Sequence, residues 1–108
     1  MTEVRFYEDS KEFSIEVEGH AGYAEMGSDI VCSAISILIQ TLEAYMDVVA
    51  TETDSEIRSG YAWVYGKGSE AIESFRTILT GLRLIEATYP EYISIEEGCT
   101  LISSPKFV

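Results

Sequence analysis

Two residues in the first third of this 108-residue chain could form a nucleophile and its base. They are Cys32, one of two cysteines, and His20, the single histidine, twelve positions before it. A thiol attacks a carbonyl group only as the thiolate, and a histidine beside a cysteine can accept the thiol proton. The residue types alone leave simpler explanations open. A cysteine near an apolar helix is typically a small core residue, and a lone histidine typically has a structural role.

Other kinds of site find less support in the residue pattern. His20, Cys32 and Cys99 are the only imidazole and thiol groups, and no Cys-x-x-Cys or His-x-x-x-His pair occurs, so we expect neither a metal nor a cofactor. A glycine-rich loop before a helix can bind phosphate, but this one lacks the Gly-x-x-x-x-Gly-Lys-Ser pattern. A redox function would need Cys99 as the resolving partner of Cys32. We expect both thiols to be reduced.

Charge and apolar patterning limit the class of partner. The chain has 19 Asp and Glu against 7 Lys and Arg, a net charge of −12. Such a surface repels nucleic acids and anionic lipids and attracts basic polypeptides. No apolar run approaches the roughly 20 residues of a membrane span, and residues 1–6 lack the basic-then-apolar order of a signal peptide. We therefore expect a cytoplasmic protein that binds neither nucleic acid nor membrane.

Apolar periodicity predicts the elements that must position these residues. Alternation of Phe13, Ile15 and Val17 with polar residues predicts a half-buried strand. Stripes at helical spacing predict a largely buried helix over about 30–49 and a second helix that starts after an N-cap at Ser69 and stops at Tyr89-Pro90. The predicted strands cover 4–8, 13–18, 57–65 (a strand or a hairpin), 92–95 and 100–103. This order predicts one α+β domain over residues 1–108, with two helices packed on a mostly antiparallel sheet.

The predicted elements bring the cysteine to a helix start. With Ser28 or Asp29 as N-cap, Cys32 falls in the first helical turn, near unpaired N–H groups that could stabilise an oxyanion. His20 follows the second predicted strand and begins a loop with glycines on both sides. Asp29 has two possible roles at this stage: it caps the helix, or it orients the imidazole of His20.

Residues 19–24, Gly-His-Ala-Gly-Tyr-Ala, and 27–36, Gly-Ser-Asp-Ile-Val-Cys-Ser-Ala-Ile-Ser, resemble the signature of the bacterial ribosomal-processing cysteine proteases. These enzymes remove an N-terminal extension from a large-subunit ribosomal protein. The specific match is confined to residues 19–36, whereas the length, element order and acidity of the whole chain also fit. Ser33 stands beside the nucleophile where a small residue such as alanine is expected, and it is small as well.

The resemblance implies a catalytic dyad of His20 and Cys32, no metal or cofactor, and a homodimer. It implies a mobile loop, Ala21 to Gly27, that orders over the substrate, and cleavage after an aromatic residue in an apolar segment that precedes a basic tail. The supporting and loop residues that it implies are Gly19, Gly22, Gly27, Asp29 and Ser36. The alternative is a non-catalytic acidic dimer that binds a basic ribosomal protein as an assembly chaperone.

Overall fold

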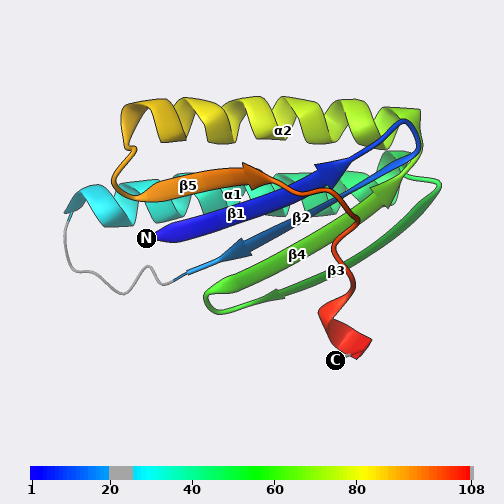
Figure 1. Ribbon diagram of the computed structural model, residues 1–108, viewed down its shortest axis with the longest axis horizontal. Helices are drawn as coiled ribbons and strands as arrows, with labels where there is room; N and C mark the ends of the chain where they lie inside the picture. Colours follow the sequence, from blue (N-terminus) through cyan, green and yellow to red (C-terminus); the bar gives the residue numbers. More distant parts are fainter. Residues whose placement is uncertain (20–25, 108) are drawn as a thin grey trace.

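A five-stranded sheet carries two helices on one face in the computed structural model, which describes residues 1–19 and 26–107 (Figure 1). The sheet order is β3-β4-β2-β1-β5, and all neighbours are antiparallel except β1 and β5. The elements are β1 (Thr2–Glu8), β2 (Glu12–Glu18), α1 (Met26–Val49), β3 (Glu52–Arg58), β4 (Tyr61–Lys67), α2 (Ser69–Thr88), β5 (Ile93–Glu97) and a short 3₁₀ helix (Pro105–Phe107). The predicted α+β fold class is confirmed.

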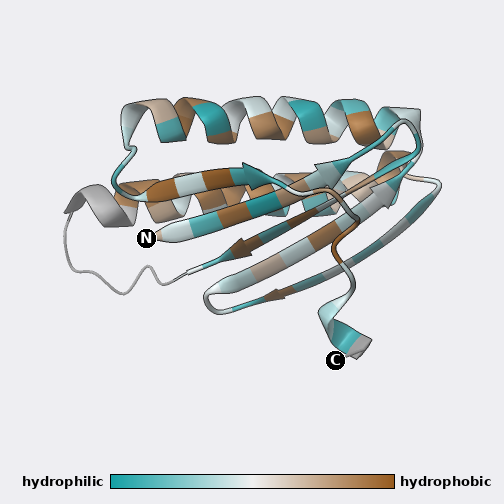
Figure 2. Cartoon of the chain, in the orientation of Figure 1, coloured by the Kyte–Doolittle hydropathy of each residue, from teal (hydrophilic) through white to brown (hydrophobic). Residues whose placement is uncertain are grey.

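The core lies between the sheet and the helices. Apolar and polar residues alternate along β1 and β5, so each strand turns one face to the helices (Figure 2). At the centre, the rings of Phe13 and Phe75 stack with their centroids 4.5 Å apart. Gly66 of β4 permits this packing, because a Cβ atom there would lie 2.6 Å from the Phe13 ring. The two helices are therefore held over the sheet by apolar contacts from both layers.

Helix α1 is apolar on two sides. Its buried stripe follows helical spacing and consists of Val31, Ile35, Ile39, Leu42 and Met46. Further apolar residues lie on its exposed surface, so the segment Ile30–Val49 is long and apolar enough to cross a membrane by length and composition. The prediction that no segment reaches this length was therefore wrong. In this fold the buried stripe of the helix forms part of the core.

Several predicted element boundaries were wrong, because contacts between distant parts of the chain decide them. The polar residues 51–55 were not expected to form a strand, yet β3 begins at Glu52. Strand β3 pairs with β4 alone at the sheet edge, where polar side chains can face solvent. The segment 57–65, predicted as a strand or a hairpin, contains the end of β3, the turn and most of β4. Gly68, not Ser69, is the N-cap of α2, whereas the predicted stop is correct because Tyr89 is its C-cap.

The predicted strand over 100–103 is absent, and this segment instead crosses the face of the sheet opposite the helices (Figure 1). The N–H of Ile102 donates to Oγ of Ser14 at 2.9 Å, and its carbonyl accepts from the Trp63 indole at 3.1 Å. Farther along, Lys106 Nζ lies 2.6 Å from Asp54 on β3. These side-chain hydrogen bonds and this ion pair hold the C-terminal segment on the sheet without strand pairing.

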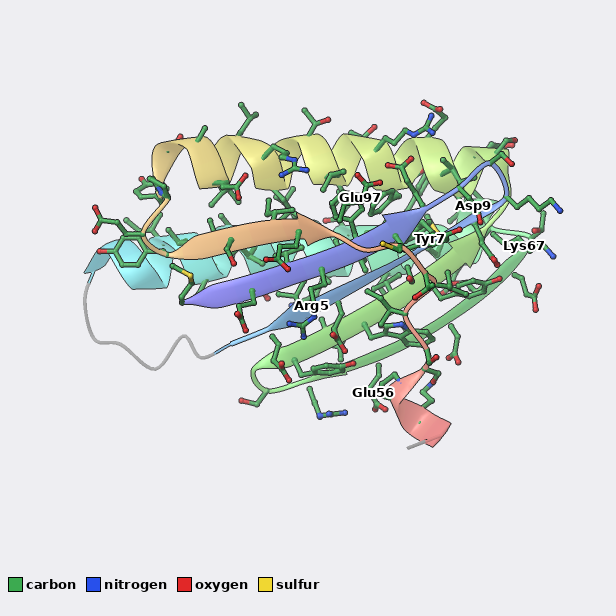
Figure 3. The ribbon with its side chains drawn as sticks, in the orientation of Figure 1. Arg5, Tyr7, Asp9, Glu56, Lys67 and Glu97 are labelled. Carbon is green, nitrogen blue, oxygen red and sulfur yellow. The ribbon has the colours of Figure 1, made fainter. Side chains whose placement is uncertain are left out.

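The rest of this outer face is polar (Figure 3). Arg5 bonds to Glu16 at 2.7 Å and to Glu18 at 3.2 Å across neighbouring strands. The Tyr65 hydroxyl donates to Glu12 at 2.8 Å, and burial together with this bond raises the pKa of Tyr65 to about 12. The carboxylates of this face are thus partly engaged by neighbouring tyrosine and arginine side chains.

Candidate active site

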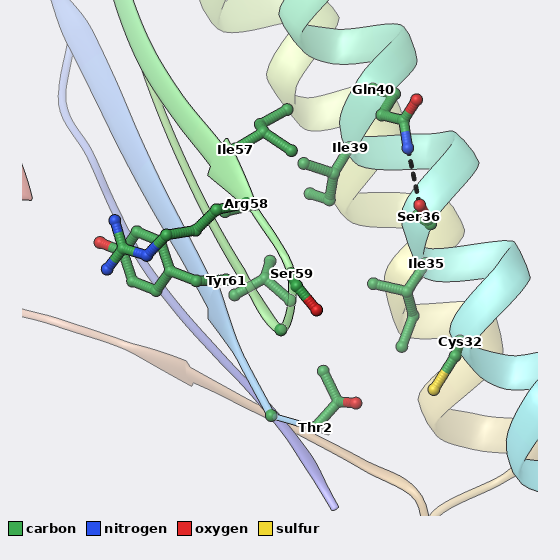
Figure 4. A pocket seen from close by; sticks show the side chains of 14 residues that line it. Thr2, Cys32, Ile35, Ser36, Ile39, Gln40, Ile57, Arg58, Ser59 and Tyr61 are labelled. Carbon is green, nitrogen blue, oxygen red and sulfur yellow. Dashed lines mark hydrogen bonds between the residues drawn. The ribbon is translucent and has the colours of Figure 1, made fainter. Parts of the chain in front are cut away.

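Cys32 opens onto a pocket of about 440 Å³ between α1 and the β3–β4 hairpin (Figure 4). Its side chain is half-buried and its thiol is free. Strands β1 and β2 contribute their ends to the pocket through Thr2, Val17 and Gly19. From α1 come Cys32, Ile35, Ser36, Ile39 and Gln40, and from the hairpin come residues 57–62. The candidate nucleophile is therefore reachable from a cavity walled by three parts of the chain.

The predicted position of Cys32 within its helix was wrong. Helix α1 begins at Met26, so Cys32 is its seventh residue and lies beyond the first turn. Only the first four N–H groups of a helix lack a helical partner, and the effect of the helix dipole falls off within that turn. Ser28 and Asp29 are therefore not N-caps, and the helix start does not supply an oxyanion site at Cys32 itself. A capping preference of about 1 kcal/mol is too small to fix a helix start by residue type.

Gly19 is the predicted supporting residue with the clearest structural role. Its φ is +145°, and its N–H donates to the carbonyl of Gly60 at 3.0 Å. An added Cβ atom would lie 2.7 Å from the Met1 carbonyl oxygen and 2.9 Å from Cα of Thr2. Glycine at this position therefore lets the end of β2 lie against both the hairpin turn and the first strand. The next residue in the chain is His20.

Not all of the predicted site falls within the described part of the chain. His20, Gly22 and the predicted loop residues up to position 25 lie outside it. Gly27 was predicted in that loop, but it is the second residue of α1, and Asp29 is the fourth. The pairing of His20 with Cys32 thus stays a prediction.

Ser36 lies one helical turn after Cys32 and lines the same pocket. Its Oγ accepts a 2.7 Å hydrogen bond from Nε2 of Gln40, one turn further along (Figure 4). Sequence reasoning missed Gln40, because a polar residue on an amphipathic helix is expected to face solvent, and Gln40 is exposed where it lines the pocket. The signal was its spacing: positions 32, 36 and 40 recur every four residues and so share one side of the helix.

The pocket is mainly apolar, with a polar rim at the hairpin turn. Ile35, Ile39 and Ile57 line its walls, and the Arg58 guanidinium lies 4.3 Å from the centroid of the Tyr61 ring. Burial and a hydrogen bond to a carboxylate raise the pKa of Tyr61, so its hydroxyl stays protonated at neutral pH. Within residues 1–19 and 26–107, no cluster of His, Cys, Asp and Glu could hold a metal ion. Such a cavity suits an apolar stretch of polypeptide.

Cys99, the other thiol, is exposed and does not line this pocket. A single thiol that faces an apolar cavity fits the class of cysteine hydrolases better than a dithiol redox protein. Residues 1–94 match the family model described as Cysteine protease Prp, and the chain belongs to that family of cysteine proteases. The predicted family resemblance is thereby confirmed.

One sequence relative agrees with this assignment, and the solved structures of two other proteins share the fold. The ribosomal processing cysteine protease Prp of Mycoplasma pneumoniae is 26% identical over 85 residues, which cover 77% of this chain and 85% of that protein. The ribosomal processing protease Prp of Staphylococcus aureus has been solved with a substrate peptide and with a covalently linked product peptide. It superposes with a TM-score of 0.76 at 23% identity, over 91% of this chain and 100% of that chain. The SMU.848 protein of Streptococcus mutans gives a TM-score of 0.71 at 24% identity, over 90% and 93% of the two chains.

Proposed function

We propose that this protein is an endopeptidase that removes the N-terminal extension of a bacterial large-subunit ribosomal protein. The observation that carries the proposal is the thiol of Cys32 at an apolar, peptide-sized pocket, in a chain that belongs to a cysteine protease family. The name of the Mycoplasma pneumoniae relative supports ribosomal processing as the task. A net charge of −12 further suits a substrate whose remaining chain is basic.

In the proposed mechanism, the Cys32 thiolate attacks the scissile carbonyl carbon after its proton has passed to His20. The tetrahedral adduct collapses to a thioester, and the leaving amine takes the proton from His20. Water then attacks the thioester, which releases the new carboxylate and restores the thiol. The reaction needs no metal or cofactor.

The direct test is to incubate the protein with a peptide that spans the extension and basic start of the ribosomal protein and to weigh the products by mass spectrometry. We expect one cut, after an aromatic residue in the apolar segment. Binding of the peptide without any cut would contradict the protease proposal and favour the assembly chaperone.

His20 should control the pH at which Cys32 reacts. Replacing His20 by alanine removes the proton acceptor, so alkylation of Cys32 by iodoacetamide, followed as a rate against pH, should slow at least about tenfold at neutral pH. Alkylation can be followed by mass spectrometry of the labelled peptides. Exposed Cys99 in the same sample is the internal control, and its profile should not move. An unchanged Cys32 profile would remove His20 from the mechanism.

We also propose that the protein is a homodimer that pairs through the exposed side of α1. Ile30, Ile37 and Val48 are 55%, 62% and 74% exposed on this helix. Ile30 and Ile37 are seven residues apart and so share one side of the helix. Apolar side chains gathered on one helix surface are typical of a protein–protein contact. A dimer contact would also cover the apolar side chains that make α1 resemble a membrane span.

A charge placed in this contact should separate the subunits. Ile37→Glu should raise the dimer dissociation constant at least tenfold, about 1.4 kcal/mol, because an unpaired carboxylate would be buried at the contact. Sedimentation velocity across a concentration series measures the constant. Leu84→Glu is the matched control, because Leu84 is 66% exposed on α2. Equal constants for both variants, or a monomeric parent protein, would contradict this interface.

The cytoplasm is the proposed location, and nucleic acids and membranes are not proposed as partners. The high negative charge supports the exclusion of nucleic acids and anionic membranes, because it disfavours phosphate-rich partners. The buried stripe of α1 further supports the exclusion of membranes, because it already packs against the sheet.

A further inference from the structure

The C-terminal segment, residues 98–107, crosses the outer face of the sheet from β5 to β3 (Figure 1). Near its start, the N–H of Gly98 donates to the carbonyl of Phe6 in β1 at 2.7 Å. Near its end, Nζ of Lys106 lies 2.6 Å from the carboxylate of Asp54 in β3. The contacts between these two points fall on β2 and β4, in the order of the strands in the sheet. One stretch of chain that follows β5 therefore connects all five strands.

Ile102 is held in the middle of this path by two buried side chains of neighbouring strands. Its N–H donates to Oγ of Ser14 at 2.9 Å, and its carbonyl accepts from the indole of Trp63 at 3.1 Å. Both side chains point away from the helices, since their strand neighbours Phe13 and Val64 belong to the core. Ser14 and Trp63 are nevertheless only 0% and 3% exposed. Their burial on the outer face indicates that the C-terminal segment covers them.

The strands under this segment also form the pocket wall opposite Cys32. In β4, Tyr61 lines the pocket two residues before Trp63. In β3, Ile57 lines it three residues after Asp54. Strand β3 lies at the edge of the sheet and pairs with β4 alone, so contacts from the two faces of the sheet help to hold it in place.

Two consecutive residues tie β3 from opposite faces. Oγ of Ser55 donates to Glu43 of α1 at 2.7 Å on the side of the helices. Asp54 binds Lys106 on the outer side, because successive side chains of a strand point to opposite faces. Strand β3 is thus held between the helix that carries Cys32 and the C-terminal segment.

We propose that the C-terminal segment positions the β3–β4 wall of the pocket, so that the wall lies opposite Cys32 at the spacing that a bound peptide requires. Ile102 and Lys106 are then positioning residues, since neither of them lines the pocket. Docking of the segment and binding of a peptide favour each other, because both need the same position of the wall. This inference rests on the proposed protease function for its substrate, and it concerns a segment outside residues 1–94 of the family match.

The main test changes the segment and leaves every residue of the sheet intact. Ile102→Pro removes the N–H that donates to Ser14, and Lys106→Ala removes the cation. The two changes are combined, because an exposed ion pair alone contributes little. Trp63 is the single tryptophan of the chain, so stronger quenching of its fluorescence by acrylamide should report release of the segment. Lys11→Ala in the exposed turn between β1 and β2 makes the same change of charge and is the matched control.

Release of the segment should weaken peptide binding without disabling the nucleophile. For the peptide of the cleavage assay, KM should rise at least about fivefold in the double variant, whereas kcat should change little. In the Cys32→Ala background, fluorescence anisotropy should show a similar rise in the dissociation constant. The rate at which iodoacetamide alkylates Cys32 should stay close to that of the parent protein, because this small reagent does not need the wall.

Two further measurements separate positioning from a loss of stability. Saturating peptide should reduce acrylamide quenching of Trp63 in the Cys32→Ala protein, because the coupling between two binding events is reciprocal. Ser14→Ala removes the acceptor of the Ile102 N–H and should raise KM and quenching to a smaller extent than the double variant. Both are measured below the melting temperature of each variant, where a purely structural role would leave KM unchanged.

The outcomes distinguish this inference from the protease proposal. Stronger quenching with unchanged KM and dissociation constant would overturn the positioning role and leave the protease standing. Unchanged quenching in the double variant, or an equal rise in KM in Lys11→Ala, would also overturn the positioning role. No cleavage by the parent protein, with peptide binding that weakens on release of the segment, would overturn the protease and support the positioning role. Neither cleavage nor binding by the parent protein would overturn both.

Discussion

Cys32→Ala should lower the rate of peptide cleavage at least about a thousandfold, because it removes the atom that forms the thioester. The side chain is half-buried, and removing one sulfur atom should leave the fold intact. Mass spectrometry of the peptide products measures the activity, and circular dichroism with a thermal melt checks the fold. Full activity in a folded Cys32→Ala protein would contradict the proposed nucleophile.

Cys99→Ala is the matched control for this experiment. Cys99 is exposed and lies outside the pocket, so its loss should leave kcat/KM unchanged. The same control tests the redox alternative, which needs Cys99 as the resolving thiol. Unchanged cleavage in the Cys99→Ala protein would contradict the dithiol alternative.

Gly19→Ala should reduce both stability and activity. The new Cβ atom would lie 2.7 Å from the Met1 carbonyl oxygen, at a φ of +145° that favours glycine. We expect the free energy of unfolding to fall by about 1–3 kcal/mol, because the end of β2 must move away from β1. Since Gly19 directly precedes the proposed base, kcat/KM should also fall at temperatures where the variant is folded. Urea unfolding and peptide cleavage measure the two effects.

Gly98→Ala provides the matched comparison. Gly98 does not have a positive φ, and the atom nearest to its added Cβ would be the Phe6 carbonyl oxygen at 3.6 Å, an ordinary contact. Its replacement should change stability and activity little. If the two glycine variants behave alike, Gly19 has no special role in positioning the site.

Much of the local structure could be predicted from the sequence. The alternation of Phe13, Ile15 and Val17 predicted β2, because side chains on a strand point to opposite faces in turn. The apolar spacing predicted α2, because residues three or four positions apart lie on one face of a helix. The residues with this spacing are Ile72, Phe75, Ile78 and Leu82. The signature around Cys32 identified the family and placed Gly19 and Ser36 among the site residues.

The remaining features depend on contacts between distant parts of the chain. Strand β3 is polar, and only its pairing with β4 at the sheet edge makes it a strand. Residues 100–103 look like a strand, but Ser14 and Trp63 bind them across the outer face instead. Gln40 belongs to the pocket because the β3–β4 hairpin lies opposite α1.

The sequence by itself thus determined the main periodic elements, the protease family and the candidate nucleophile. Only the tertiary structure decided where α1 begins, which strand forms the sheet edge and which residues share the cavity with Cys32. The physical reason is the distance along the chain over which each kind of interaction acts. Periodicity and signature residues act between neighbours in the chain, whereas a pocket is formed by side chains that meet only after the sheet and helices have packed.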